Sequence, residues 1–304
     1  FQVEYFHSRR AQQKFDAFLE ENLPQHIFCQ LIRTAEYVKS YRTIPKTLDY
    51  MDAFSAGMAK MANSASWPLR VFMQKEQGRL DRYERSIADH FEHHLIISEQ
   101  DAKCIPIDRP MHVLANGIDP SFFERKSVKT SRDLLFTGNM SYRPNVESAR
   151  FLASEVMPLV WKRYPDLTLT LAGANPAAAV QALKGRHIEV TGWVDDIFSV
   201  YASSKIFVAP MLINSGLQNK LLEAMASGLP SITTQLANNA LGAAAGKEIL
   251  IANDATEISE AIFRLIEDAD FAQQLASSGQ SYVTGAYSWK TEVARMESIM
   301  QIAP

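Results

Sequence analysis

Short apolar runs that end in glycine alternate with stretches of helical spacing through the second half of this chain. The glycine-terminated runs are DLLFTG (133–138), LTLTLAG (167–173) and IEVTG (188–192), and further strands are predicted at KIFVAP (205–210), SITT (231–234) and EILIA (248–252). Between them, apolar residues recur at helical intervals over 146–164, 175–184, 217–227, 256–267 and 270–284, and a short helix begins at Asp195 or Asp196. Strands that alternate with helices predict an α/β fold with a parallel, doubly wound sheet.

The first half of the chain is less regular. Strands followed by turns are predicted at 93–102 and 111–119, and a strand over 46–55 runs into an acidic loop. The segment 69–92 has an amphipathic pattern, and its five basic and five acidic side chains predict a solvated outer face. A helix that lies on a membrane should be more one-sidedly basic. The polar segment 121–132 lacks periodicity and is the predicted linker between the two halves.

Composition excludes several classes of protein. The 304 residues carry a net charge of −3, so no overall field attracts nucleic acid. The sequence has no window of about 18 apolar residues that could span a bilayer. Its two cysteines suit a reducing compartment and hence a cytoplasmic location. The chain begins at Phe1 rather than methionine, so we expect its true N-terminus to lie upstream.

Ligands of open parallel sheets lie in the loops that follow the strands. The sequence has no GxGxxG or GxxxxGK[ST] loop and no Cys/His cluster with zinc spacing, so neither a redox cofactor nor a metal is expected. The loop before the helix at 217–227 is the strongest candidate: Gly216 allows close approach, the helix N-terminus favours an anion, and Lys220 adds a charge suited to phosphate. Glu223 could accept hydrogen bonds from a ribose diol. Alternatively, Lys220 and Glu223 simply pair across one helical turn.

Six motifs in order resemble retaining, family 4 glycosyltransferases (glycosyl transferases group 1) with the GT-B fold. They are VLANGID (113–119), LLFTGNMSYRPNVESARFLASEVMP (134–158), LTLAG (169–173), VTGWVDDI (190–197), GLQNKLLEAMASGLPSITT (216–234) and YSW (287–289). The variants of these motifs look most like a bacterial branch of exopolysaccharide and cell-surface glycan enzymes. The resemblance implies two Rossmann-like domains: an incomplete acceptor-side domain over 1–127 and a donor-binding domain over 128–285. A final helix within 286–304 would return to the first domain.

The same resemblance implies a reaction and its partners. A hexosyl group would move from a UDP- or GDP-sugar to a glycan or lipid-linked acceptor, with retention and without a cofactor. Whether the protein also makes a peripheral contact with the inner face of the membrane is left open by the resemblance. A GT-B sugar-nucleotide epimerase is one alternative, although it should keep acidic and histidine residues that are not evident here. A non-catalytic nucleotide-sugar-binding scaffold of a glycan assembly complex is the other.

Individual roles follow from the matched motifs. Glu223 would bind the ribose, and Lys220 would hold the diphosphate with the backbone of the preceding loop. The family's usual Glu-x7-Glu pattern is broken, because Ser215 stands where the first glutamate would contact the donor sugar. The remaining donor-binding candidates are Gly138 and Arg143 near the diphosphate, Trp193 and Val194 beside the base, and Gly216, Leu217 and Gln218 in the loop.

Two aspartates are the candidate catalytic groups. Asp49 and Asp52 lie at the end of the strand predicted within 46–55, where relatives carry a polar or acidic residue facing the cleft. Either could act as a base or stabilise positive charge at the anomeric carbon. The alternative is that both cap the following helix. The donor phosphate is thought to assist the acceptor proton in this family, so a strong protein base is not required.

Overall fold

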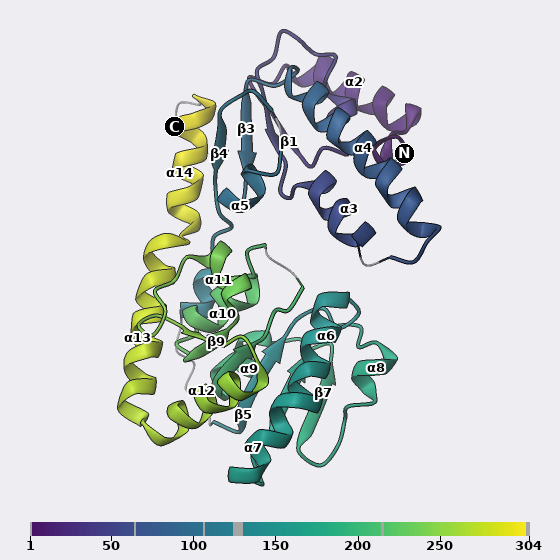
Figure 1. The fold of residues 1–304 in the computed structure, drawn as a ribbon. Coiled ribbons are helices and arrows are strands. Elements are labelled where there is room, and N and C mark those ends of the chain that lie inside the picture. The colour runs from purple at the N-terminus through teal and green to yellow at the C-terminus, as the bar shows by residue number, and fades with distance from the viewer. Residues whose placement is uncertain (1, 64, 106, 124–129, 214–215, 302–304) are drawn as a thin grey trace. The chain divides into compact units, whose positions relative to one another are not determined.

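The computed structural model describes residues 2–63, 65–105, 107–123, 130–213 and 216–301, which form two compact units (Figure 1). The first unit runs to Ala115 and includes the segment that begins at Lys290, and the second runs from Asn116 to Trp289. Each unit contains one sheet in which every strand pair is parallel. The predicted domain boundary at 127–128 lies outside the described residues.

The second unit has a six-stranded sheet in the order β10-β9-β8-β5-β6-β7. Its strands are β5 (Arg132–Thr137), β6 (Leu169–Ala172), β7 (Ile188–Gly192), β8 (Ser204–Ala209), β9 (Ser231–Thr233) and β10 (Leu250–Ile251). The chain passes from β5 outward to β6 and β7 and then returns to the other side of β5 at β8. This reversal makes the sheet doubly wound, as the sequence predicts, and places a topological switch point between β5 and β8.

Helices follow the strands of this unit in alternation. They are α6 (Arg143–Phe151), η3 (Leu152–Val156), α7 (Met157–Arg163), α8 (Ala178–Gln181), α9 (Ile197–Ala202), α10 (Asn219–Ala226), α11 (Gln235–Leu241), α12 (Ala255–Glu267) and α13 (Ala269–Ala286), after the short η2 (Pro120–Phe123). The predicted helix over 146–164 contains a wider π-helical turn, η3. Pro158 has no N–H for the usual bond one turn back, which accounts for the wider turn there.

Two predicted helices are shorter than expected. The one over 175–184 is reduced to the single turn α8, because Asn175 has a left-handed φ of 51° and the chain turns before Ala178. The helix expected from Leu217 begins at Asn219 instead. Gln218 is extended, with φ −102° and ψ 99°, so the helix cannot start earlier.

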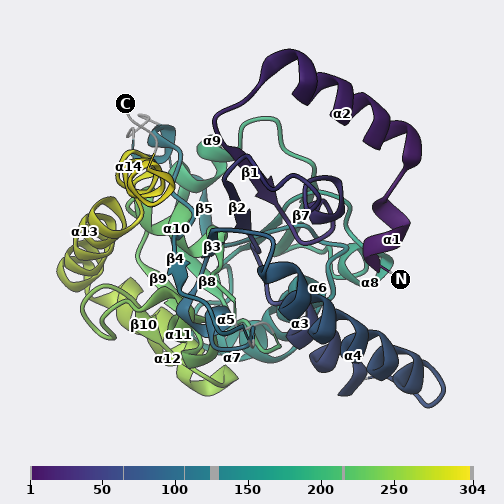
Figure 2. The same ribbon diagram turned by 90° about the horizontal axis from the view of Figure 1, so that it is seen from above.

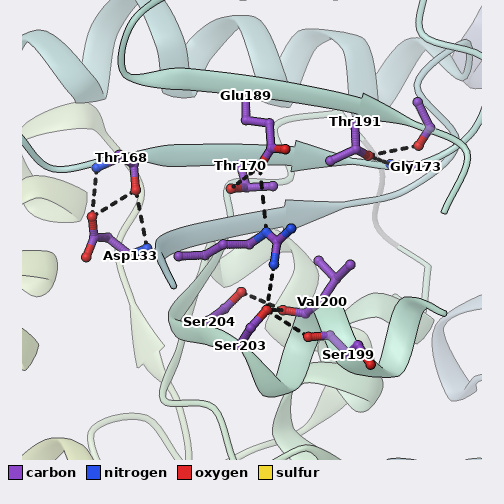
Figure 3. Close-up of polar contacts among 12 residues, drawn as sticks. Asp133, Thr168, Thr170, Gly173, Glu189, Thr191, Ser199, Val200, Ser203 and Ser204 are labelled. Atoms are coloured by element: carbon purple, nitrogen blue, oxygen red, sulfur yellow. Dashed lines mark hydrogen bonds and ion pairs between the residues drawn. The ribbon is translucent and has the colours of Figure 1, made fainter. Parts of the chain in front are cut away.

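Polar contacts fix the amino-terminal edge of this sheet (Figure 3). The Asp133 carboxylate accepts hydrogen bonds from the backbone N and Oγ1 of Thr168, at 3.0 and 2.8 Å, which ties β5 to the start of β6. Arg132 Nη1 donates to Ser203 Oγ at 2.6 Å, and its Nε lies 3.6 Å from the Glu189 carboxylate. Because these contacts lock the register at one edge, the loops at the other edge start from fixed positions.

The first unit has a four-stranded sheet in the order β1-β2-β3-β4. Its strands are β1 (Ile27–Gln30), β2 (Lys46–Asp49), β3 (His93–Ile96) and β4 (Met111–Val113). The helices are α1 (Gln2–Phe6), α2 (Arg9–Asn22), η1 (Ala35–Tyr37), α3 (Phe54–Asn63), α4 (Leu69–Ala88), α5 (Glu99–Ala102) and α14 (Trp289–Met300). Arg295 on α14 donates to the Val113 carbonyl at 3.2 Å and so joins the final helix to β4.

Helices α3 and α4 form a pair beside this sheet (Figure 2). The Glu84 carboxylate of α4 is buried and accepts hydrogen bonds from Ser55 N at 3.1 Å and Ser55 Oγ at 2.5 Å, so it caps the start of α3. Glu76 is buried as well, so the predicted solvated outer face is wrong for Glu76 and Glu84. Among the described helices, none holds an apolar stretch long enough to cross a membrane.

Candidate functional site

The loops at the carboxyl ends of β5 and β8 meet at the topological switch point of the second unit, where ligands of such sheets bind. Gly138 follows β5 with φ 153°, and its N–H donates to the Ala172 carbonyl at 3.0 Å. Gly173 follows the neighbouring β6, and a Cβ there would lie 1.9 Å from the Gly138 carbonyl oxygen. A Cβ on Gly138 would lie 2.6 Å from the Asn145 side-chain amide. The backbone therefore packs too closely here for any side chain.

The Lys220 amine lies at this crevice, on the first turn of α10. It donates to Asn145 Oδ1 on α6, lies 3.7 Å from Met211 Sδ, and is 5.1 Å from the centroid of the Phe136 ring. Burial lowers the pKa of the amine to about 8, and the nearby Glu223 carboxylate opposes this shift. The amine thus bonds a neutral amide rather than the carboxylate one turn along.

A chain of hydrogen bonds orients the Glu223 carboxylate. Its Oε2 accepts from the Tyr201 hydroxyl at 2.8 Å, and that hydroxyl lies 2.6 Å from Thr137 Oγ1. Since the tyrosine has one proton and the carboxylate can only accept, Thr137 donates to Tyr201. Burial raises the pKa of Glu223, opposed by the Tyr201 hydrogen bond and by Lys220. The chain links the end of β5 to α9 and α10, so the carboxylate is held by three elements.

The start of α10 provides backbone donors. Gln218 precedes the helix and its Nε2 donates to the Gly216 carbonyl at 2.7 Å, which leaves the first turn without a side-chain cap. Uncapped N–H groups and the positive end of the helix dipole favour an anion at this position. Leu217 is half-buried between Gly216 and Gln218. Ser215 lies outside the described residues.

The other predicted donor contacts lie on different elements. Arg143 is the first residue of α6. Trp193 and Val194 follow β7, which is the edge strand and is separated from β8 by β6 and β5. Trp193 is 75% exposed, and its indole N–H donates to Asp195 Oδ1 at 3.0 Å. The strand order therefore places this pair at the β7 edge of the sheet, with β6 between β7 and β5.

Asp49 and Asp52 both lie at the carboxyl end of β2 in the first unit. Asp49 Oδ1 accepts from the Met51 N–H at 3.0 Å, and burial raises the pKa of this carboxyl. Met51 has a left-handed φ of 62°, an uncommon conformation for a residue with a side chain. Asp52 is exposed. The carboxylate that caps α3 is Glu84, so helix capping does not explain either aspartate.

Three residues of the second-unit site were missed by the sequence analysis. Asn145 lies within the quoted MSYRPN motif but carried no assigned role, and Thr137 and Tyr201 were counted only as strand and helix residues. A polar residue at the end of a buried strand, as Thr137 is, is a usable signal. Tyr201 gives no such signal, because its partner Glu223 is far along the chain.

A cavity of about 730 Å³ lies at the opposite edge of the same sheet. Its lining includes Asp133, Arg163 and Lys205. Their charges are already paired, with Lys205 Nζ 2.7 Å from Asp133 Oδ1 and Arg163 Nη2 2.5 Å from Glu267 Oε1. The cavity faces the amino ends of the strands, and we assign the ligand site to the carboxyl ends instead.

Comparisons with known proteins show what the chain is similar to. Residues 131–268 match the family described as Glycosyl transferases group 1. An uncharacterized 44.6 kDa protein in the cps region of Klebsiella pneumoniae is 26% identical over 167 residues, which is 52% of this chain and 43% of that protein. The chain thus spans less than half the length of this curated relative.

Two solved structures share the fold. Sucrose-phosphate synthase (tll1590) from Thermosynechococcus elongatus superimposes with a TM-score of 0.74 at 14% identity, over 95% of this chain and 76% of that one. Anabaena Alr3699/HepE in complex with UDP gives 0.74 at 14% identity, over 96% and 82%. A second structure of that protein contains UDP and glucose. The two parallel sheets have the GT-B fold, and residues 131–268 are the part of the chain that matches the glycosyl transferases group 1 family.

Proposed function

We propose that the chain transfers a sugar from a UDP- or GDP-sugar to a glycan or lipid-linked acceptor in surface polysaccharide synthesis, with retention at the anomeric carbon. One observation carries the proposal: the Lys220 amine and the Glu223 carboxylate lie one helical turn apart at the start of α10, beside the switch point between β5 and β8. The UDP in the Anabaena protein and the cps-region relative support the donor and the pathway class.

The donor diphosphate would bind at the start of α10. The uncapped N–H groups of the first turn and the Lys220 amine would neutralise it, and Gly138 would let it approach the loop after β5. Arg143, at the start of α6, would add a second charge. In the reaction the same groups stabilise the negative charge that develops on the leaving diphosphate, without a metal.

The ribose would bind one turn deeper. Tyr201 occupies Oε2 of Glu223, so we assign Oε1 and the remaining lone pairs to the ribose hydroxyls. Because the carboxylate is fixed by the Thr137–Tyr201 chain, little conformational freedom is lost on binding. Trp193 and Val194 would flank the base from the loop after β7.

Acceptor chemistry would involve the first unit. Asp49 and Asp52 are our candidates for a group that stabilises positive charge or accepts a proton, with the donor phosphate oxygen assisting the acceptor hydroxyl. The raised pKa of Asp49 favours proton uptake at a higher pH than for an ordinary aspartate. A lipid-linked acceptor would bring the protein to the inner face of the membrane, as a peripheral contact.

The test of the reaction uses full-length protein, UDP- and GDP-sugars in turn, and lipid-linked acceptors. Release of UDP or GDP that requires an acceptor supports transfer. Tight nucleotide binding without turnover for every donor and acceptor would instead support the scaffold alternative. Interconversion of donor sugars without an acceptor would support the epimerase.

The test of the site measures nucleotide affinity. Glu223→Ala is expected to weaken binding by about 1.5 kcal/mol, or more than tenfold, because charged hydrogen bonds to the ribose are lost. Glu260→Ala removes an exposed glutamate of α12 and serves as the matched control. Equal affinity in the Glu223 and Glu260 variants would contradict the assigned role.

A further inference from the structure

Exposed apolar side chains gather where α3 passes into α4. Met61, Trp67, Leu69, Val71 and Phe72 are 50, 78, 49, 39 and 55% exposed. Apolar residues scattered singly over a surface are ordinary, whereas a cluster marks a surface that binds something. We call residues 61–75, as far as they are described, the α3–α4 tip.

A large part of each of these side chains is exposed to solvent. The tip lies at the end of the α3–α4 pair that points away from the sheet of the first unit (Figures 1 and 2). Further along α4, Leu80 and Ile87 are only 2% exposed and belong to the core. Phe72 has the helical spacing to lie on the same face as Leu80 and Ile87, yet it is 55% exposed. Packing in the core therefore explains the apolar side chains on the later turns of α4, but it does not explain those on the first turn.

The charge at the tip has one sign. Residues 61–75 include Arg70 and Lys75 and neither aspartate nor glutamate, and Lys60 directly precedes them. The side chains of Arg70 and Lys75 are exposed. The first acidic residue is Glu76, which is buried. Although 69–92 has equal numbers of acidic and basic side chains, its acidic residues all lie at or after Glu76. The exposed apolar side chains lie before Glu76, so they are accompanied only by basic residues.

We propose that the α3–α4 tip docks on an anionic lipid surface. Trp67 and Phe72 would insert at the level of the head groups, where aromatic rings are favoured, while Arg70 and Lys75 would pair with lipid phosphates. The combination of exposed aromatic rings with basic side chains and no carboxylate suits phosphate head groups above an apolar layer. The contact is shallow, since only one turn and the preceding connection take part.

This proposal names the surface for the membrane contact suggested above, and it does not depend on sugar transfer. Vesicle binding can be measured without donor or acceptor, and nucleotide release can be measured with a soluble acceptor. The two proposals can therefore fail separately.

The test is co-sedimentation of the full chain with vesicles of phosphatidylcholine alone, or mixed with phosphatidylglycerol at about three to one. The wild type is expected to bind the mixed vesicles and to show a blue shift of tryptophan emission that Trp67→Phe removes. Arg70→Glu with Lys75→Glu is expected to weaken binding by about tenfold or more. Trp67→Ser with Phe72→Ser should weaken it comparably.

Matched controls separate the tip from general surface properties. Trp193→Ser removes an indole of nearly equal exposure in the second unit, and Lys184→Glu with Arg186→Glu reverses two exposed charges there. Both controls should keep lipid binding. Failure of the wild type to bind mixed vesicles, or equal binding by tip and control variants, would overturn the proposal. A dimer that Trp67→Ser dissociates, without lipid binding, would overturn it in favour of a second copy.

Discussion

The pKa of the Lys220 amine predicts how donor affinity changes with pH. Burial lowers this pKa to about 8 in the unliganded protein, so the amine changes charge within an accessible range. Only the protonated amine attracts the diphosphate. The affinity for the nucleotide sugar should therefore be highest below the pKa of the amine and should fall as the pH rises through about 8.

The size of the effect follows from the protonated fraction. With a pKa of about 8, the amine is about 97% charged at pH 6.5 and about 24% charged at pH 8.5, so affinity should drop about fourfold. A nucleotide sugar is the right ligand, since its diphosphate is esterified at both ends and takes up no proton in this range. Calorimetric titration at several pH values measures the change directly.

The control is Lys220→Arg, whose guanidinium stays charged throughout. Its donor affinity should differ from the wild type in absolute value but should not depend on pH between 6.5 and 8.5. A flat profile in the wild type, or the same fourfold decline in Lys220→Arg, would refute the assignment of the diphosphate to this amine.

Three further substitutions test the contacts around the sites. Tyr201→Phe removes the hydroxyl that holds Glu223, so it should lower the free energy of unfolding by about 1–2 kcal/mol in chemical denaturation and also weaken nucleotide binding. Ser55→Ala removes the hydroxyl that donates to the buried Glu84 carboxylate and should lower the free energy of unfolding by about 1–3 kcal/mol without altering nucleotide affinity. Gly138→Ala places a methyl group 2.6 Å from the side-chain amide of Asn145 and imposes a strained φ, so nucleotide affinity should fall. Unchanged affinity would show that the diphosphate does not approach the backbone at Gly138.

The sheet of the second unit could be predicted because its signals are local. Each buried strand is a short apolar run that ends in glycine, and these runs alternate with helical patterns long enough to recognise. Strand β1 of the first unit gave no such signal. It has four residues, and only alternate side chains are buried, so its sequence resembles many other short segments.

The candidate site was only partly predictable for the same reason. Lys220 and Glu223 are near neighbours in sequence, and the helix start before them is visible in the loop composition. The groups that position them come from elsewhere: Asn145 lies 75 residues from Lys220, and Tyr201 lies 22 residues from Glu223. Contacts of this kind depend on the strand order, which the sequence pattern alone does not specify.

The neutral partner of the Lys220 amine also bears on turnover. Asn145 holds the amine without cancelling its charge, so the protonated amine can attract an anion. A nucleoside diphosphate released by transfer carries an additional ionisable phosphate oxygen compared with the nucleotide sugar. Coulomb attraction then favours the product over the substrate. We therefore expect the leaving nucleotide to inhibit competitively and its departure to limit the rate at low ionic strength, with moderate salt speeding the cycle.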